Sequence, residues 1–205
     1  SIWMTGPFVD LDADQIEADV TSWYKLMFKL EKELEQGGAT KPARVAAEMK
    51  SKINDFRGNV DIINYLRNPG LRQRHWDIIS STLAPNRAPL VPDNDLTLSQ
   101  ILTLDVSTHK MAIEEICTAA GKEYGLEQNL DKMLAEWTAM VLNLEEYKAT
   151  KTFILKDSDD ILTLLDDQIM KTQSMRGSPY IKPFEARTKK WESRLQLMSQ
   201  VMEEW

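Results

Sequence analysis

The feature that most constrains this chain is an apolar repeat with alternating spacings of four and three residues. It first occupies residues 14–36 and is typical of an amphipathic helix that buries one face. Its members are Ile16, Val20, Trp23, Met27, Leu30 and Leu34. Three aspartates precede the repeat, where carboxylates suit the positive end of a helix dipole, and Gly37-Gly38 ends it. The pattern therefore predicts a helix over residues 14–36.

The same kind of spacing recurs along the chain, and the eight glycines and eight prolines cluster between its occurrences. Gly121 and Gly125 bracket an expected helix break, because glycine is a poor helix former. Further helices are predicted at about 40–66, 71–83, 96–104, 107–120, 126–140, 156–177 and 182–205. Such elements favour antiparallel packing, so the expected fold class is mainly α, built from elongated antiparallel helical bundles.

The helical period stops between residues 141 and 156. Leu142 and Leu144 alternate with polar residues, and residues 152–155 (Thr-Phe-Ile-Leu) are β-prone. This change predicts one short β-hairpin at about 141–156. A two-stranded hairpin is marginal in water by itself, so it should lie against helices or project toward a partner. It holds more apolar residues than one face can bury, so we expect some of them to stay exposed.

Three prolines within residues 84–95 mark the clearest connection in the chain. We expect a first helical bundle over residues 1–83, a proline-rich connection over 84–95, and a second helical region over 96–205. The second region would hold the hairpin and a long C-terminal helix. The chain opens with Ser-Ile-Trp-Met and has no secretory leader pattern, so we expect it to be a piece of a longer polypeptide.

Charge and cysteine content narrow the function classes. With 32 acidic and 25 basic residues, the net charge of −7 is too acidic for a dedicated nucleic-acid binder. No stretch approaches 18 uninterrupted apolar residues, so no membrane partner is expected. Cys117 is the single cysteine, which excludes an internal disulfide and a zinc site built from several cysteines.

Motifs for cofactors and metals give no candidate residues. A phosphate-binding loop needs glycines that wrap the phosphates before a Gly-Lys pair and a hydroxyl after it. In this chain Gly121-Lys122 is followed by Glu123, and Ile116 stands where the first glycine belongs. The aspartate-rich residues 157–160 lack the central glycine of a calcium loop, so helix N-capping is favoured there.

The two histidines, His75 and His109, are too far apart in sequence for a metalloprotease pair. One of them could meet Cys117 in space and form a centre for nucleophilic catalysis, and this alternative stays open. The opposing interpretation is an ordinary core cysteine, which is the usual state of an isolated helical cysteine.

Six tryptophans could suggest a cage for a carbohydrate or a methylated ammonium group. Four of them lie on the apolar stripes, which favours large core anchors between helices. These four are Trp23, Trp137, Trp191 and Trp205. Lysine and arginine are interspersed with acids, so no basic patch stands out. Taken together, the residues favour a helical interaction or mechanical module over an enzyme.

Three stretches resemble the linker region of dynein heavy chains: residues 68–79 (NPGLRQRHWDII), 102–137 and 154–205, with a weaker match in 16–66. The sequence SPYIKPFE at 178–185 resembles that of an axonemal heavy chain more than that of a cytoplasmic one. The resemblance implies a structural role for the signature residues. They are Asn68, Pro69, Leu71, Arg72, Arg74, His75, Trp76, Trp137, Ser178, Pro179, Phe184, Trp191 and Trp205.

The resemblance implies that this chain is a mechanical part of a motor and is separate from the part that hydrolyses ATP. In dyneins, ATP with Mg²⁺ is bound in a ring of AAA+ modules elsewhere in the heavy chain, and the linker is a helical lever across that ring. By this resemblance the fragment is not an enzyme and holds no cofactor. Its partners would be the AAA+ ring and the tail of the same heavy chain, with the microtubule engaged only indirectly. Its location would be the cytoskeleton of the cytoplasm, in the axoneme of a cilium or flagellum.

The hairpin offers the expected contact with the ring, since the ring must touch the linker to drive it. The candidate contact residues are Leu142, Leu144, Phe153 and Leu155. The alternative function is a passive helical-bundle scaffold or adaptor for protein–protein interaction.

Overall fold

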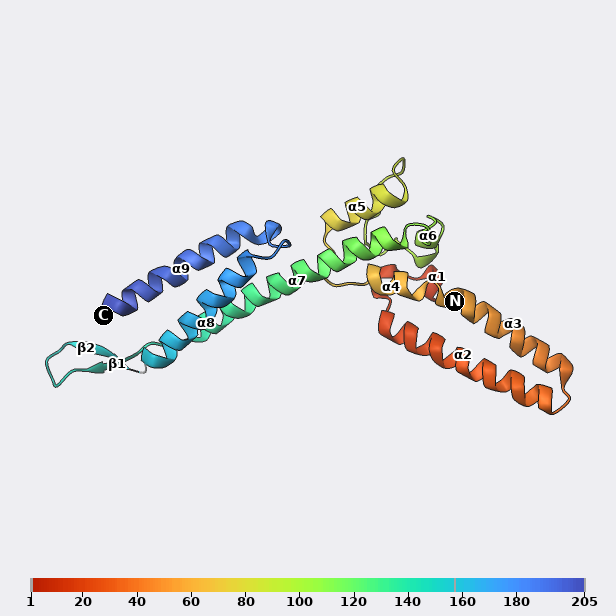
Figure 1. The fold of residues 1–205 in the computed structure, drawn as a ribbon, viewed down its shortest axis with the longest axis horizontal. Coiled ribbons are helices and arrows are strands. Elements are labelled where there is room, and N and C mark those ends of the chain that lie inside the picture. The colour runs from red at the N-terminus through yellow and green to blue at the C-terminus, as the bar shows by residue number, and fades with distance from the viewer. Residues whose placement is uncertain (1, 157, 205) are drawn as a thin grey trace. The chain divides into compact units, whose positions relative to one another are not determined.

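The computed structural model describes residues 2–156 and 158–204. The chain divides into two compact units, residues 1–121 and 122–205, which are described separately. Among the described residues the fold is mainly α-helical with one two-stranded antiparallel hairpin, which confirms the expected fold class (Figure 1). No helix in these described ranges combines the length and the apolar character that a membrane crossing requires.

The first unit is built around a long antiparallel helix pair and several short elements. Its helices are α1 (Ile2–Thr5), η1 (Phe8–Asp10), α2 (Ala13–Gln36), α3 (Thr40–Arg57), α4 (Val60–Leu66), α5 (Gln73–Leu83), α6 (Leu98–Leu102) and the first part of α7 (Lys110–Ala139). Asp12 caps α2 by accepting a hydrogen bond from the backbone N–H of Gln15 at 3.0 Å. The helix predicted over 40–66 is divided at Gly58-Asn59 into α3 and α4.

The core of the first unit lies where the short elements meet. Its fully buried members include Phe8, Ile63, Ile79, Leu98, Ile101 and Ile113. The N-terminal segment is tied to the residues before α6, because the Phe8 N–H donates to the Leu96 carbonyl at 2.7 Å. Residues that are distant in sequence therefore form this core.

The proline-rich segment 84–95 belongs to the first unit. The Leu90 N–H donates to the Ser80 hydroxyl at 2.7 Å, and Leu90 packs against the core. The division of the chain falls at Gly121 and thus differs from the expected one at 84–95. Prolines stop the helix there, but they do not stop the neighbouring leucines from being buried with the first core.

Helix α7 is continuous through Gly121 and Gly125, so the expected break there is wrong. A glycine within a helix costs only about 1 kcal/mol relative to alanine, which tertiary packing can offset. A Cβ atom at Gly121 would lie 3.1 Å from Nδ2 of Asn68, so this position accommodates a close side-chain approach. The same Asn68 amide donates to the Cys117 carbonyl at 3.0 Å.

The expectation that Trp23 is a core anchor is also wrong. Its side chain is 44% exposed on α2 and stacks on Trp3, with ring centroids 5.2 Å apart. The apolar repeat of α2 is longer than the surface that the first core covers, because only Ile16 and Val20 of that helix are buried. Trp205, the last of the expected anchors, lies outside the described residues.

The second unit is a helical assembly of elements consecutive in sequence. It contains the second part of α7, β1 (Asn143–Glu146), β2 (Phe153–Lys156), α8 (Ser158–Arg176), η2 (Lys182–Phe184) and α9 (Glu185–Glu204). Helices α8 and α9 lie side by side and run in opposite directions (Figure 1). Its buried core includes Leu130, Met133, Ile161, Leu165, Met175 and Leu195.

Candidate functional site

The hairpin predicted at 141–156 is present, and its register gathers apolar side chains on one face. Leu144 pairs with Leu155, and Glu146 pairs with Phe153. Side chains alternate between faces along a strand, and directly paired residues share a face. Leu144, Phe153 and Leu155 therefore share one face with Glu146, and Leu142 lies just before β1. We call Leu142, Leu144, Phe153 and Leu155 the hairpin apolar face.

The hairpin apolar face begins at the core of the second unit and continues into solvent. Leu155 is half-buried and packs against the core that contains Leu165. Leu144 and Phe153 are 53% and 55% exposed, and Leu142 is also exposed. Figure 1 shows the two strands extending away from α8. The base of the hairpin is thus anchored, while its outer apolar side chains are available for a partner.

The opposite face of the hairpin is mixed in character. Glu145 and Lys156 form an exposed ion pair at 3.4 Å, which contributes little to stability. Ile154 is 44% exposed on this face. The two faces therefore differ in chemistry, and Ile154 is an apolar control position opposite the apolar face.

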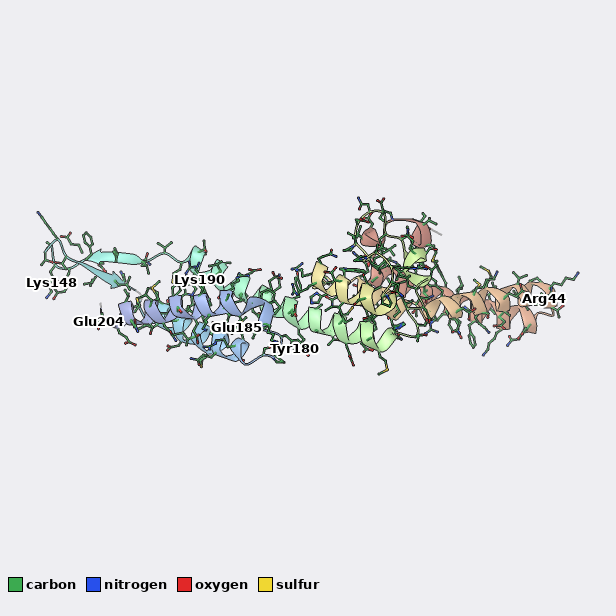
Figure 2. All side chains as sticks on the ribbon, turned by 90° about the horizontal axis from the view of Figure 1, so that it is seen from above. Arg44, Lys148, Tyr180, Glu185, Lys190 and Glu204 are labelled. Carbon is green, nitrogen blue, oxygen red and sulfur yellow. The ribbon has the colours of Figure 1, made fainter. Side chains whose placement is uncertain are left out.

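The turn of the hairpin has an unusual backbone. Figure 2 labels Lys148, which lies in this turn. Lys148, Ala149 and Lys151 have φ angles of 48°, 56° and 62°, in the left-handed region that favours glycine. The Glu146 carboxylate accepts from the Lys151 N–H at 3.0 Å and helps to hold the turn. Such backbone strain persists where the surroundings enforce it, and it is found often at functional sites.

The signature residues 68–76 form the connection between α4 and α5. Asn68 accepts the Gly70 N–H at 2.8 Å through its side-chain oxygen. His75 is buried, and its Nδ1 atom accepts from the Arg72 N–H at 3.0 Å, which satisfies a backbone donor at the start of α5. Trp76 is 3% exposed and meets Phe8 edge-to-face, with centroids 6.4 Å apart.

Pro69, Arg72 and Arg74 are exposed or partly exposed around this connection, and Leu71 packs half-buried against the first core. The side chains of Asn68 and His75, which are next to these residues in sequence, bond to backbone atoms of the same unit. This part of the signature thus joins the start of α5 to α7 within the first unit.

The signature residues of the second unit lie along its helices and the α8–α9 connection. Trp191 is buried, Trp137 and Phe184 pack half-buried against the second core, and Pro179 is exposed. The Ser178 hydroxyl accepts from the Tyr180 N–H at 3.3 Å in the connection. The structure therefore places residues 68–76 in one unit and those from Trp137 to Trp191 in the other. Trp205 lies outside the described residues.

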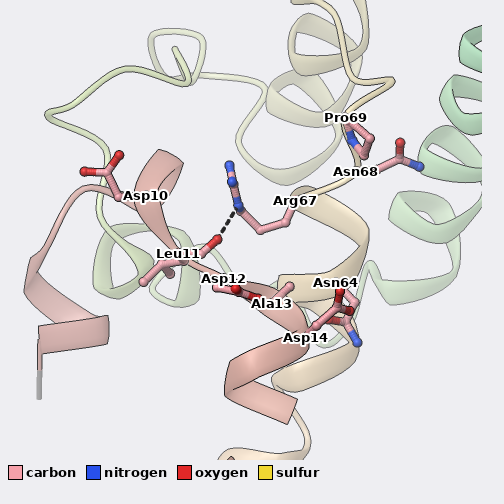
Figure 3. Close-up of a pocket in the computed structure, with 9 residues that line it drawn as sticks. All are labelled: Asp10, Leu11, Asp12, Ala13, Asp14, Asn64, Arg67, Asn68 and Pro69. Carbon is pink, nitrogen blue, oxygen red and sulfur yellow. Dashed lines mark hydrogen bonds between the residues drawn. The ribbon is translucent and has the colours of Figure 1, made fainter. Parts of the chain in front are cut away.

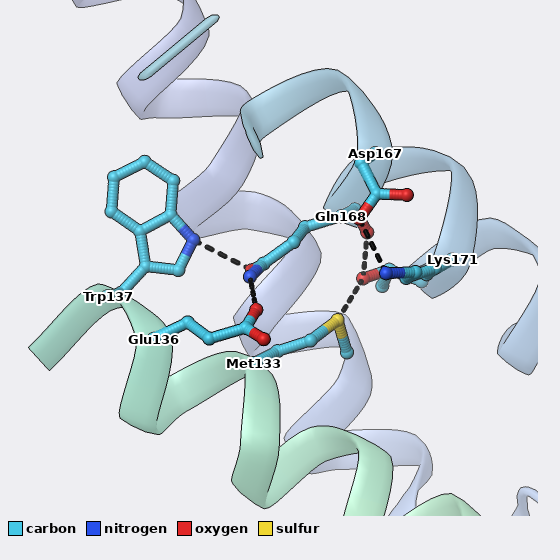
Figure 4. Close-up of polar contacts among 7 residues, drawn as sticks. Met133, Glu136, Trp137, Asp167, Gln168 and Lys171 are labelled. Carbon is cyan, nitrogen blue, oxygen red and sulfur yellow. Dashed lines mark hydrogen bonds and ion pairs between the residues drawn. The ribbon is translucent and has the colours of Figure 1, made fainter. Parts of the chain in front are cut away.

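A polar cluster crosses the second core between α7 and α8 (Figure 4). The Gln168 side chain is fully buried, accepts from the Trp137 indole N–H at 2.7 Å and donates to the Glu136 carboxylate at 2.7 Å. Every buried amide atom in this bridge has a partner, so the bridge specifies the register of the two helices. Gln168 is not among the residues that the sequence singles out, because a glutamine in a helical pattern gives no sign of its burial.

A polar hollow of ≈ 580 Å³ lies at the start of α2 in the first unit (Figure 3). Asp10, Asp12 and Asp14 line it together with Arg67, whose Nε atom donates to the Leu11 carbonyl at 2.7 Å. Asp12 is used as the helix cap. Within the described ranges, no group of three or more His, Cys, Asp or Glu residues is arranged to hold a metal ion. The hydrogen bond from Arg67 therefore ties the residues just before α2 to the end of α4.

The chemistry of Cys117 argues against the His/Cys alternative. Burial raises the pKa of its thiol to about 12, so the thiolate needed for nucleophilic attack is scarce at neutral pH. His109 is half-buried and its Nδ1 atom lies 3.3 Å from the Asp105 carbonyl oxygen, while Nδ1 of His75 accepts from the Arg72 N–H. In the aspartate-rich segment, Asp159 and Asp160 lie in the first turn of α8, as helix-end carboxylates do. Asp157 lies outside the described residues.

Comparison with known proteins gives a match over the entire chain. The family model described as "Dynein heavy chain, N-terminal region 2" matches residues 1–205. The chain is 40% identical over 203 residues to dynein axonemal heavy chain 1 of Mus musculus, covering 99% of this chain and 5% of that protein.

Two further relatives carry similar names. Identity is 37% over 203 residues to dynein axonemal heavy chain 3 of Homo sapiens, with 99% of this chain and 5% of that protein covered. It is 36% over 211 residues to dynein axonemal heavy chain 12 of Homo sapiens, with 99% and 7% covered. The chain thus spans only about one-twentieth of the length of the first relatives it matches. With the family model matched end to end, this chain belongs to the family described as dynein heavy chain, N-terminal region 2.

Proposed function

We propose that this region is a mechanical linker of a dynein motor. It would act as a lever that couples ATP-driven changes in an AAA+ ring, elsewhere in the same heavy chain, to movement of the tail along microtubules. The observation that carries the proposal is the match of all 205 residues to an N-terminal region of dynein heavy chains. In this proposal ATP is bound and hydrolysed by the rest of the motor, in the axoneme of a cilium or flagellum.

The secondary structure suits a part that transmits force. α7 has 30 residues, which at about 1.5 Å per residue span roughly 45 Å without a break. α2, α8 and α9 contain 24, 19 and 20 residues. Long helices whose hydrogen bonds are internal to the helix deform little along their axes, so a displacement at one end reaches the other.

The hairpin apolar face supports the proposal as the contact with the ring. A lever can be driven only if the ring binds it differently in different nucleotide states. Leu144 and Phe153 offer exposed apolar area for such a contact, while Leu155 connects the hairpin to the second core. A displacement imposed on the hairpin would then be transmitted to the helices of that unit.

The test uses the full-length heavy chain and compares the two faces of the hairpin. The double variant Leu144→Ser/Phe153→Ser removes apolar area from the hairpin apolar face, and Ile154→Ser is the matched control on the opposite face. We expect the double variant to slow microtubule gliding and leave basal ATP hydrolysis intact, and the control to glide normally. Circular dichroism checks that both variants are folded.

Normal gliding by a folded double variant would remove the hairpin from the mechanism. A second variant separates the lever from the passive scaffold. A flexible Gly-Ser insertion within α7 should uncouple ATP hydrolysis from gliding, whereas the same insertion in residues 84–95 should have less effect. Gliding that tolerates the insertion in α7 would favour a passive helical scaffold.

A further inference from the structure

The second unit has an apolar groove that its own side chains do not fill. The groove has a volume of ≈ 480 Å³ and runs between the end of α7 and α9. Trp137, Trp191, Leu195 and Met198 line it, and all four belong to or pack against the second core. The groove is therefore an open side of that core.

Exposed aliphatic side chains border the groove. Leu134, Leu197 and Val201 line it and are 41%, 60% and 47% exposed. The lining residues of α9 extend from Trp191 to Val201, which at about 1.5 Å per residue is roughly 15 Å of helix. That length matches about three helical turns, as in amphipathic helices bound in grooves through anchors at i, i+3 or i+4, and i+7.

One end of the groove carries positive charge. A smaller hollow of ≈ 200 Å³ shares Leu134 and Trp191 with the groove and is lined by Arg187, Lys190 and Arg194. Arg187 is paired with Asp131 at 2.5 Å. Lys190, labelled in Figure 2, and Arg194 have no carboxylate partner within residues 2–156 and 158–204. Two unpaired cations at an apolar groove fit an occupant with carboxylates.

Trp191, which lines the groove, also carries an unsatisfied hydrogen-bond donor. The nitrogen is buried and has no hydrogen-bond acceptor in the described part of the chain. The other core tryptophan of this unit, Trp137, has an acceptor in Gln168. A buried donor without an acceptor costs free energy and calls for an explanation.

We infer that the groove is occupied by an amphipathic helix of the same heavy chain, from the part that follows residue 205. Its apolar side would cover Trp137, Leu197 and Val201, and its carboxylates would pair with Lys190 and Arg194. The inference rests on family membership, since this N-terminal region covers only 5% of its relatives, and it does not depend on the lever function.

The position of the groove favours this source. Val201, which lines the groove, lies within one turn of Glu204, the last described residue of α9, so the polypeptide that follows starts close to the groove. Connections between bundle helices commonly have about two to eight residues, so a following helix could reverse direction and enter the groove directly. Covalent attachment also gives such a segment a millimolar effective concentration, which no separate chain has at ordinary expression levels.

Thiol labelling tests the inference, because Cys117 is buried and its raised pKa keeps it unreactive. Val201→Cys places a thiol at the groove, and Ser193→Cys places one on an exposed part of α9 that does not line it. Labelling rates are compared in the 205-residue chain, in a chain extended by the next segment of its heavy chain, and in the full heavy chain.

We expect Val201→Cys to react at least about tenfold more slowly in the extended chain than in the 205-residue chain, equivalent to about 1.4 kcal/mol of protection. Ser193→Cys should react equally in both. Adding Lys190→Glu/Arg194→Glu should restore fast labelling at the groove, and the control Lys189→Glu, which does not line it, should not.

Three results would overturn the inference. Equal labelling of Val201→Cys in the short and extended chains would show that the following segment does not cover the groove. Protection that appears only with rising concentration of the 205-residue chain would identify a second copy as the occupant. Protection found only in the full heavy chain, or unaffected by charge reversal, would indicate a remote or uncharged occupant.

Discussion

The two units build their cores in different ways. In the first unit, Phe8, Trp76, Leu98 and Ile113 come from four elements that are distant in sequence. The buried polar side chains of this unit, His75 and Ser80, bond to backbone atoms. In the second unit, the core joins consecutive helices and includes the polar Gln168. The first core depends on shape and apolar area, whereas the second adds a hydrogen-bonded bridge that specifies how its helices align.

The buried threonines of the second unit sharpen this difference. Thr172 donates to the Gln168 carbonyl at 2.7 Å and Thr188 donates to the Phe184 carbonyl at 2.9 Å, each within its own helical turn. The Gln168 side chain reaches from α8 to Trp137 and Glu136 of α7. The Thr172 hydroxyl also donates to the Met133 sulfur of α7 at 3.9 Å. The buried Glu192 carboxylate of α9 accepts two hydrogen bonds from Arg176 of α8, so polar contacts align α8 with both of its neighbouring helices.

The largest expected effect tests the apolar core. Trp76→Ala should lower the free energy of unfolding by about 3–5 kcal/mol, because it removes a buried indole and leaves a cavity beside Phe8. Chemical denaturation measures the change. Trp23→Ala is the matched control on a half-exposed tryptophan and should cost much less. Equal losses for the two tryptophans would mean that burial does not determine their contributions.

The next effect tests the polar bridge. Gln168→Ala should cost about 1–3 kcal/mol, because it leaves the Trp137 indole N–H without its acceptor inside the core. Gln173→Ala, on the exposed side of the same helix, should be close to neutral. A loss of stability that hydrogen exchange detects only in the second unit would show that the two cores are independent. No loss at all would show that the bridge adds nothing to stability.

The third effect is a pH dependence of the first unit. The pKa of Cys117 rises from 9.0 to about 12 on burial, so the folded state holds this proton more tightly than the unfolded state. This contribution to stability is complete below pH 9 and declines by about 1.4 kcal/mol per pH unit as the pH rises toward 12. Denaturation between pH 8 and 10 should show a steeper decline than in Cys117→Ala. Parallel curves for the two proteins would contradict the raised pKa.

The smallest expected effect concerns the hairpin. Leu144→Ser should change the free energy of unfolding by less than about 0.5 kcal/mol, since its side chain is 53% exposed and lies outside both cores. Leu155→Ser should cost more, because Leu155 packs against the second core. Thermal denaturation of the two variants compares the outer and inner parts of the hairpin apolar face. A large loss for Leu144→Ser would mean that this side chain is covered in solution.

Local sequence patterns by themselves determined the element types. The repeat in residues 14–36 and the aspartate cap predicted α2, the change of period predicted the hairpin, and the turn at 68–70 placed the start of α5 within a few residues. Periodicity and capping act over one or two turns, so they can be read along the chain.

Only the tertiary structure decided what each apolar stripe meets. The α2 repeat did not reveal that Trp23 stays half-exposed. The glycines of α7 suggested a helix break because their low helix propensity can be read from the sequence, whereas the close approach of Asn68 to Gly121 cannot. The burial of Gln168, the shared face of Leu144 and Phe153, and the groove beside Trp191 were likewise decided by packing. The physical reason is that burial depends on which surfaces approach one another, and residues distant in sequence supply those surfaces.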